Sequence, residues 1–354
     1  MNRLILAGAM AVALLPAQGD IVRTLFAPGA GTSERPSAVV GTIVDGRAQI
    51  QAFGTVRLGS SEPPRENTVY EIGSITKGLT GILLADMALA GEVSLHDTLD
   101  KFLPDAAALP ESIRRITLLQ LATHSSGLPR LPANLASSVK DPSNPYAHYG
   151  RRELETFLRA YAPPPGRTTI EPVYSNLGFG LLGWVLSLKA GMPYEALLNA
   201  RVLEPLGMRD TTITLSADHR RRLAPGHAHG KAVNNWDLDV LAGAGAVRST
   251  AADMMKLLQA LMQATSRPPS SRIGKAIRLA LEPRGQLGAA RIGLAWITTS
   301  PPAGAPFTWH NGGTGGYRSF IGFRQDGGAG IVVLTNGSDQ SPDPLAVQAL
   351  QKLR

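Results

Sequence analysis

A serine and a lysine three residues apart could form a nucleophile and its activating base. Ser74 and Lys77 stand where an apolar segment with helical periodicity begins. On a helix their side chains share one face about 5–6 Å apart, so the lysine amine can reach the serine oxygen. A serine needs such a neighbour to become a good nucleophile, and lysine acts as a base only when burial or a nearby cation lowers its pKa from about 10.4. The competing interpretation is a helix-capping serine beside a surface lysine.

The backbone N–H of Ser74 adds a second property if a helix begins there. The first N–H groups of a helix have no partner within it and can bind an oxyanion. The same S-x-x-K pattern occurs at Ser137 and Lys140, but in a segment rich in Pro and Asn, where we expect a loop and no helix to present the pair. The sequence therefore favours Ser74 over Ser137 as the nucleophile.

Two further segments carry groups that fit acyl transfer. Tyr174 and Asn176 form a Y-x-N pattern just before a helical segment. A phenol beside a lysine ammonium can be pushed toward phenolate and move protons, and an asparagine side chain can hold a substrate amide. The glycines of segment 310–316, which begins with His310, let a ligand lie along a strand edge, where a second backbone N–H can complete an oxyanion hole. Alone, these segments would indicate a packing tyrosine and a glycine-rich hairpin.

Other patterns point to no metal and no cofactor. The chain has no cysteine, which excludes disulfides, thiolate metal sites and a cysteine nucleophile. Residues 178–183 match G-x-G-x-x-G but follow no apolar strand, so we expect close helix packing and no bound dinucleotide. His227 and His229 lack an obvious third ligand, so we expect a polar loop and no metal site there.

The order of elements along the chain indicates how these residues are positioned. Strand patterns occupy both ends of the chain, with a hairpin turn expected at Asp45-Gly46, and helical patterns lie between them. We therefore expect an α/β protein of the α+β type, with an antiparallel sheet built from both termini, flanked by helices, and a helical subdomain inserted between. The expected domain is 20–354, its α/β part about 20–100 and 270–354 and its helical part about 101–269.

The first residues predict export. Arg3 is followed by an apolar run over 4–15 and then by small residues before Asp20, which is the layout of a secretory signal peptide over 1–19. At about 1.5 Å per residue the run is too short to span a bilayer, so we expect a soluble periplasmic protein with no stable membrane insertion. The alternative is a buried N-terminal helix. The net charge of +8 comes from scattered basic residues, so we expect no nucleic-acid partner.

The order S-x-x-K, Y-x-N and then a basic-x-Gly strand resembles the penicillin-recognising serine hydrolases, which comprise class C β-lactamases, D-alanyl-D-alanine peptidases and family VIII esterases. Segments 71–77, 121–129, 205–208 and 249–253 are similar to the class C branch and spread the resemblance over about 38–338. The resemblance implies the β-lactamase/DD-peptidase fold and metal-independent hydrolysis, through an acyl-enzyme, of a β-lactam or a D-Ala-D-Ala-type amide. The substrate would be a small molecule or a peptidoglycan peptide. A carboxylesterase on the same site, or a penicillin-binding sensor without turnover, are the alternatives.

The resemblance also implies catalytic roles. Ser74 would be the acylated nucleophile, Lys77 its activating neighbour and Tyr174 the proton shuttle. His124 lies in the 121–129 segment and is expected to be structural. Class C enzymes usually carry a glutamine where this chain has Leu131, so the resemblance is incomplete beside this segment.

Substrate binding is implied for a second group of residues. Asn176 would hold the substrate amide, and the N–H of Gly313 would complete the oxyanion hole with that of the nucleophile. Class C enzymes carry Lys-Thr-Gly where this chain has His310, Asn311 and Gly312. A histidine is mostly neutral at pH 7. We therefore expect any grip of His310 on a substrate carboxylate to depend on pH.

Overall fold

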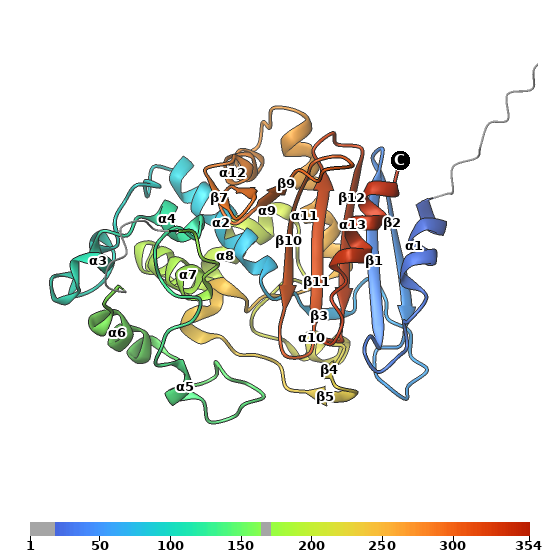
Figure 1. The fold of residues 1–354 in the computed structure, drawn as a ribbon, viewed down its shortest axis with the longest axis horizontal. Coiled ribbons are helices and arrows are strands. Elements are labelled where there is room, and N and C mark those ends of the chain that lie inside the picture. Colours follow the sequence, from blue (N-terminus) through green and yellow to red (C-terminus); the bar gives the residue numbers. More distant parts are fainter. Residues whose placement is uncertain (1–17, 164–170) are drawn as a thin grey trace, which may run out of the picture.

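The computed structural model describes residues 18–163 and 171–354, and its central feature is an antiparallel sheet (Figure 1). Within these residues the sheet has eight strands in the order β2-β1-β12-β11-β10-β9-β8-β7. Because β1 pairs directly with β12, both ends of the chain build one sheet, as expected from the sequence. The strands are β1 (Ser37–Val44), β2 (Arg47–Gly54), β7 (Gly285–Leu287), β8 (Ala290–Ile292), β9 (Ile297–Thr299), β10 (Phe307–Gly313), β11 (Arg318–Arg324) and β12 (Ala329–Thr335).

The hairpin between β1 and β2 follows from its turn residues. Asp45 and Gly46 have φ angles of +47° and +78°, which aspartate and glycine tolerate better than most residues. Val44 pairs with Arg47 on either side of this two-residue turn. The expected turn at Asp45-Gly46 is therefore confirmed.

Helices cover both faces of the sheet, because strands β1 and β12 are mostly apolar and are buried along their whole length. Successive side chains of a strand point to opposite faces, and every residue of β1 and β12 is buried. Val39 and Ile43 belong to the core shared with α2 and α11, whereas Val40 and Val44 pack with α1 and α13 on the other face. These helices, with the neighbouring α12, are α1 (Gln18–Phe26), α2 (Ile75–Leu89), α11 (Ala251–Ser266), α12 (Arg272–Leu281) and α13 (Asp343–Lys352).

The middle of the chain supplies the remaining elements. Helices α3 to α7 gather beside the sheet, on the left in Figure 1. Helix α11, which the sequence analysis placed in the helical part, packs against β1 and β12 of the large sheet. The elements between β2 and α11 not yet given are β3 (Val69–Glu71), η1 (Leu99–Lys101), η2 (Ala106–Ala108), α3 (Glu111–Arg114), α4 (Leu118–Ala122), α5 (Leu135–Ser138), α6 (Arg151–Ala160), α7 (Asn176–Ala190), α8 (Tyr194–Leu198), η3 (Asn199–Leu203), α9 (Glu204–Leu206), α10 (Ala217–Arg222), β4 (Gly226–Ala228), β5 (Lys231–Val233), η4 (Asp239–Ala244) and β6 (Arg248–Thr250).

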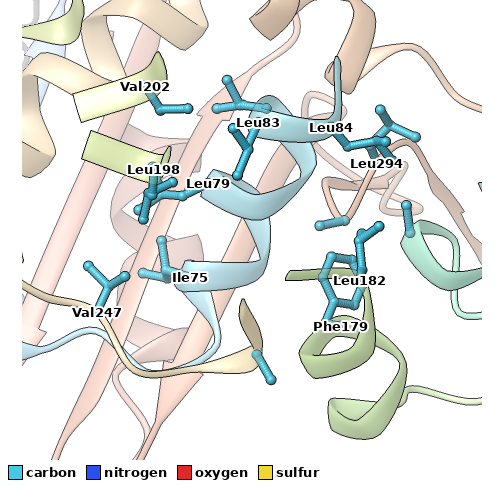
Figure 2. Close-up of a cluster of buried hydrophobic side chains, with 14 of the residues drawn as sticks. Ile75, Leu79, Leu83, Leu84, Phe179, Leu182, Leu198, Val202, Val247 and Leu294 are labelled. Atoms are coloured by element: carbon cyan, nitrogen blue, oxygen red, sulfur yellow. The ribbon is translucent and has the colours of Figure 1, made fainter. Parts of the chain in front are cut away.

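Helix α2 runs through the centre of the molecule and is buried on nearly all sides. Figure 2 shows Leu79 of α2 beside Leu198, and Phe179 of α7 across the helix from them. A Cβ atom on Gly78 would lie 2.6 Å from the indole of Trp296, so glycine is needed for this close contact. A mostly apolar helix is stable when it is buried inside a protein, and here the burial includes the first turn.

Most of the expected N-terminal signal peptide lies outside the residues that the structure describes. The expected signal peptide, 1–19, lies outside the described residues except for Gln18 and Gly19, which begin α1. Ile21, Val22 and Phe26 of α1 are buried against the sheet and α13. Within the described ranges, no helix is both long and apolar enough to cross a membrane.

Candidate active site

Ser74 lies at the start of α2, where a tight connection joins β3 to the helix. Gly73 adopts a φ of +49°, a left-handed conformation that favours glycine. A Cβ atom on Gly73 would lie 2.6 Å from the backbone nitrogen of Gly313 in β10. Only glycine therefore allows the N-terminus of α2 to approach the edge of the sheet this closely.

Lys77 lies one helical turn after Ser74 and is hydrogen-bonded to it. Its Nζ is 2.9 Å from Ser74 Oγ and donates to the backbone oxygen of Ala244 over 2.7 Å. The lysine is fully buried, and this burial, with a smaller contribution from the Arg130 guanidinium, holds its pKa well below the usual range. A lowered pKa favours the neutral amine, which can accept the proton of the Ser74 hydroxyl.

Tyr174 faces the same groups as a neutral phenol. The centroid of its ring lies 4.8 Å from Lys77 Nζ and 5.1 Å from the guanidinium carbon of Arg130. Burial raises the pKa of Tyr174 to about 12, although a hydrogen bond with Ser74 and the charge of Arg130 both lower it. The expected push toward phenolate is therefore absent, because removal from water outweighs these neighbours. The geometry fits Tyr174 as a proton donor and Lys77 as the base.

Strand β10 presents an open edge beside Ser74. Strand β11 pairs with β10 over 307–313, whereas β9 pairs with it only over 307–309. The N–H of Thr314 donates to the oxygen of Tyr317 on the β11 side. Because hydrogen bonds alternate along an antiparallel ladder, the N–H of Gly313 points to the open edge. The N–H groups of Gly313 and of Ser74 thus meet where α2 approaches β10, an arrangement that suits an oxyanion.

His310 does not line the cavity that contains Ser74. Its side chain is 0% exposed, and its Nδ1 donates to the backbone oxygen of Asn311 over 2.6 Å. Burial, reinforced by the charge of Lys77, lowers the pKa of His310 to about 3. The structure contradicts the expected conditional charge on His310, because a ring removed from water beside a lysine stays neutral at physiological pH.

The two asparagines of the expected site differ in their partners. Asn311 Nδ2 donates to Asp343 Oδ2 over 2.5 Å, so this side chain is held by the start of α13. Asn176 is the first residue of α7, and its Oδ1 is buried with no hydrogen-bond partner among the described residues. Since a buried acceptor without a partner is costly, Asn176 can gain a bond from a substrate N–H.

A cavity of about 620 Å³ brings most of these residues together. Lys77 and His310 are not among the residues that line it. The six expected site residues that do line it are Ser74, Tyr174, Asn176, Asn311, Gly312 and Gly313. The other lining residues include several to which the sequence analysis gave no role: Arg130, Tyr146, Trp236, Thr314, Arg318 and Ser341. The two arginines had a weak signal in the sequence, since Arg130 directly follows the 121–129 motif and Arg318 stands two residues after the 310–316 motif.

A buried ion pair holds the aromatic part of the cavity wall. Tyr146 and Trp236 contact each other edge to face, with ring centroids 5.2 Å apart. The backbone N–H of Trp236 donates over 3.1 Å to Glu71 Oε1, which also pairs with Arg248 Nη2 at 3.1 Å. Both charged side chains are nearly inaccessible to solvent. The pair therefore ties the Trp236 loop to β3, the strand that leads into Ser74.

His124 packs behind the site. Its φ is +59°, and its Nδ1 accepts a hydrogen bond from the backbone N–H of Ser175 over 3.0 Å. Its ring centroid lies 4.5 Å from that of Tyr174. These contacts orient the Y-x-N segment, which fits the packing role expected for His124.

The other motifs lie outside this cavity. Ser137 lies in the short helix α5, so the expectation of a loop without a helix there is wrong. Lys140 lies beyond the end of this helix, and Ser137 is exposed, with its Oγ donating to the backbone oxygen of Asn134. A Cβ on Gly183 would lie 2.9 Å from the Cα of Gly243, so close packing explains the glycines of 178–183. His229 is exposed beside Asp339. In the part of the chain that the structure describes, no group of three or more His, Cys, Asp or Glu residues is placed to hold a metal ion.

Comparisons with known proteins agree with this geometry. A family model described as Beta-lactamase matches residues 22–353. The chain is 30% identical over 306 residues to the D-alanyl-D-alanine-carboxypeptidase/endopeptidase AmpH of Escherichia coli K12, covering 82% of this chain and 77% of that protein. It is 28% identical to a beta-lactamase of the same organism, covering 93% and 91%. The crystal structure of the D-alanine carboxypeptidase AmpC from Burkholderia cenocepacia superposes with a TM-score of 0.79 at 26% identity, over 95% of this chain and 98% of that one.

Proposed function

The chain belongs to the Beta-lactamase family and is a serine hydrolase, and on this premise we propose that it cleaves β-lactam or D-Ala-D-Ala-type amide bonds through an acyl-enzyme formed on Ser74. The observation that carries the proposal is the 2.9 Å contact between Lys77 Nζ and Ser74 Oγ. The lysine in this contact is fully buried, so its amine can be neutral and can receive the serine proton. The choice of substrate class is supported by the D-alanine carboxypeptidases and the beta-lactamase to which the chain is similar.

Acylation uses Ser74 and Lys77, one helical turn apart, together with the backbone N–H of Gly313 in β10. As Ser74 Oγ attacks the carbonyl carbon, its proton passes to Lys77 Nζ. The carbonyl oxygen becomes negative and receives hydrogen bonds from the N–H groups of Ser74 and Gly313. Removing one such preorganised donor lowers the rate by about 10²–10³-fold. Gly73 allows the two donors to lie close together, because a side chain there would clash with Gly313.

Release of the leaving group requires a proton on its nitrogen. Tyr174 is suited to this step because burial keeps its phenol protonated and its ring lies beside Lys77, which contacts Ser74. The phenol gives its proton to the nitrogen as the C–N bond breaks, and the proton held by Lys77 replaces it. Water then attacks the carbonyl carbon of the ester on Ser74 and gives a proton to Lys77. That proton passes to Oγ as the C–Oγ bond breaks and the carboxylic acid leaves. Every step uses side chains and backbone groups that are close together around the nucleophile.

Ester hydrolysis on the same site is the second candidate. The observation that favours it is the neutral state of His310, since β10 then carries no fixed charge for an anionic substrate. An alcohol also leaves more easily than an amine. A sensor that is acylated by penicillin but does not turn over would use the same first step and differ only in deacylation.

The proposed setting of the enzyme is the periplasm. The signal-peptide layout of 1–19 supports export, and no helix in the described residues is suited to span a membrane. Peptidoglycan peptides and β-lactams are both available in that compartment. N-terminal sequencing of the exported protein should give a chain that begins at or near Asp20, whereas an intact Met1 would contradict export by cleavage.

The nucleophile is tested by acylation and turnover together. We expect benzylpenicillin to add covalently to Ser74, seen as an intact-mass increase mapped by peptide analysis, and Ser74→Ala to lose turnover by a factor on the order of 10⁶. Ser137→Ala is the matched control and should keep the parent activity. An adduct on Ser137, or equal losses in both variants, would contradict the proposal.

A panel of nitrocefin, p-nitrophenyl butyrate and a D-Ala-D-Ala peptide separates the candidates. Turnover of nitrocefin or the peptide supports amide hydrolysis. Turnover of the ester alone supports the esterase, and a stable penicillin adduct with no product release supports the sensor.

A further inference from the structure

The cavity next to Ser74 is positively charged although strand β10 is not. His310 is neutral, so the strand that carries lysine in class C enzymes contributes no cation here. Two guanidinium groups line the cavity instead, those of Arg130 and Arg318. No Asp or Glu is among the lining residues in the described part of the chain. A cavity with two permanent positive charges and no lining acid favours an anionic ligand.

Arg318 lies close to the reacting atoms. It is the β11 residue directly opposite Gly313 in the ladder. Its Nη1 lies beside the Cα of Gly313, in the space that a larger side chain would fill. The charge therefore lies beside the residue whose backbone N–H we assign to the oxyanion hole.

The hydrogen-bonding capacity of Arg318 is largely unused. Its Nη1 makes only long contacts, 3.4 Å and 3.5 Å, with the backbone oxygens of Thr314 and Tyr317. Among the described residues, no carboxylate oxygen lies within 4.0 Å of the guanidinium. Asp343 is near enough for the charge of Arg318 to lower its pKa, but burial raises the pKa more, and its Oδ2 is already bound by Asn311. Several guanidinium donors are therefore available to a ligand.

Thr314 gives independent support for a ligand at this position. The residue is 4% exposed and lines the cavity, and its Oγ1 has no hydrogen-bond partner among the described residues. A buried hydroxyl without a partner is uncommon and costs free energy. A ligand that accepts hydrogen bonds from both Thr314 and Arg318 would satisfy it.

Building on the proposed function, we propose that Arg318 is the specificity-determining residue that binds a carboxylate close to the scissile bond of the substrate, with the Thr314 hydroxyl as a second donor. A guanidinium is charged at every physiological pH and can donate two parallel hydrogen bonds to one carboxylate. The positive charge that β10 lacks at His310 is thus supplied by the neighbouring strand. The substrate class is accordingly an amide with a carboxylate close to the bond that breaks.

Arg130 has a different position and a different effect. It is exposed and lies over the ring of Tyr174, and its charge acts on Lys77 and Tyr174. Its loss should therefore change the activity toward charged and neutral substrates to a similar extent. This contrast allows the two arginines to be distinguished by one pair of substrates.

The test compares acylation by benzylpenicillin with acylation by its methyl ester, which has the same ring and no carboxylate. Arg318→Gln should lower the second-order acylation rate constant for benzylpenicillin by about 10- to 100-fold more than that for the methyl ester, which corresponds to loss of a charge-assisted hydrogen bond. Thr314→Val should also lower the rate constant for benzylpenicillin more than that for the methyl ester, but by a smaller factor. Arg318→Lys should keep part of the benzylpenicillin rate that Arg318→Gln loses.

Hydrolysis of p-nitrophenyl butyrate by each variant shows whether the variant is folded and its catalytic groups are intact. Arg291→Gln, an exposed arginine of β8 in the same sheet, is the matched control and should leave both rate constants unchanged. Equal losses for acid and ester in Arg318→Gln, or a larger acid-specific loss in Arg130→Gln, would overturn the proposal. If no penicillin adduct forms on Ser74 in the parent, the proposed function fails instead, so the two failures are distinct.

Discussion

Substituting Gly73 with alanine should move the two halves of the oxyanion hole apart. The added Cβ would lie 2.6 Å from the nitrogen of Gly313, whereas ordinary contacts begin at 3.4 Å, so the backbone must yield by about 0.8 Å. Displacement on the order of 1 Å within an active site costs about 10²-fold in rate. The φ of +49° adds about 1–2 kcal/mol of strain for any residue with a side chain. We therefore expect kcat/KM to fall about 100-fold and the unfolding free energy to fall by about 1–3 kcal/mol.

The assay combines p-nitrophenyl butyrate kinetics with urea unfolding of the same preparations. Gly91→Ala is the matched control, because Gly91 ends the same helix with a φ of +72° and a Cβ there would meet nothing within 4 Å. It should lose about 1 kcal/mol of stability and no activity. The reasoning is refuted if Gly73→Ala keeps kcat/KM within about threefold of the parent, or if Gly91→Ala loses as much activity.

Three further predictions follow from burial in and around the site. The pKa of Lys77 is lowered by burial, so between that pKa and about 10.4 the unfolded chain binds one more proton and the unfolding free energy rises with pH. Lys77→Met should remove that rise in urea unfolding measured across this window, and an unchanged slope would contradict the assignment. Tyr174→Phe should lower kcat for an amide by about 10²–10⁴, with a smaller effect on a p-nitrophenyl ester, whose leaving group needs no proton; equal effects on both substrates would argue against proton donation. Glu71→Ala removes the buried carboxylate partner of Arg248, leaves it only the longer contact with the exposed Asp237, and should cost about 3–5 kcal/mol by urea unfolding. The control Glu111→Ala removes an exposed pair with Arg115 and should cost less than about 1 kcal/mol, so similar costs would refute the role of burial.

Local patterns in the sequence were sufficient for much of the fold and for the centre of the site. The turn at Asp45-Gly46 depends on φ angles that those two residues accept, so a dipeptide predicts it. Ser74 and Lys77 come together because three residues along a helix place two side chains on one face. Strand patterns at both ends of the chain predicted one antiparallel sheet flanked by helices. In each case the interaction is between near neighbours or follows the period of one element.

Tertiary structure alone decided the electrostatics and the specificity of the site. Whether His310 is charged depends on how completely other elements exclude water from it, and no pattern around residue 310 contains that information. The same holds for Tyr174, whose pKa burial raises despite two neighbours that lower it. Arg318 reaches the cavity because β11 pairs with β10 in the register that places it opposite Gly313. A shift by one residue would turn this side chain to the other face of the sheet, and register is determined by contacts distant in sequence.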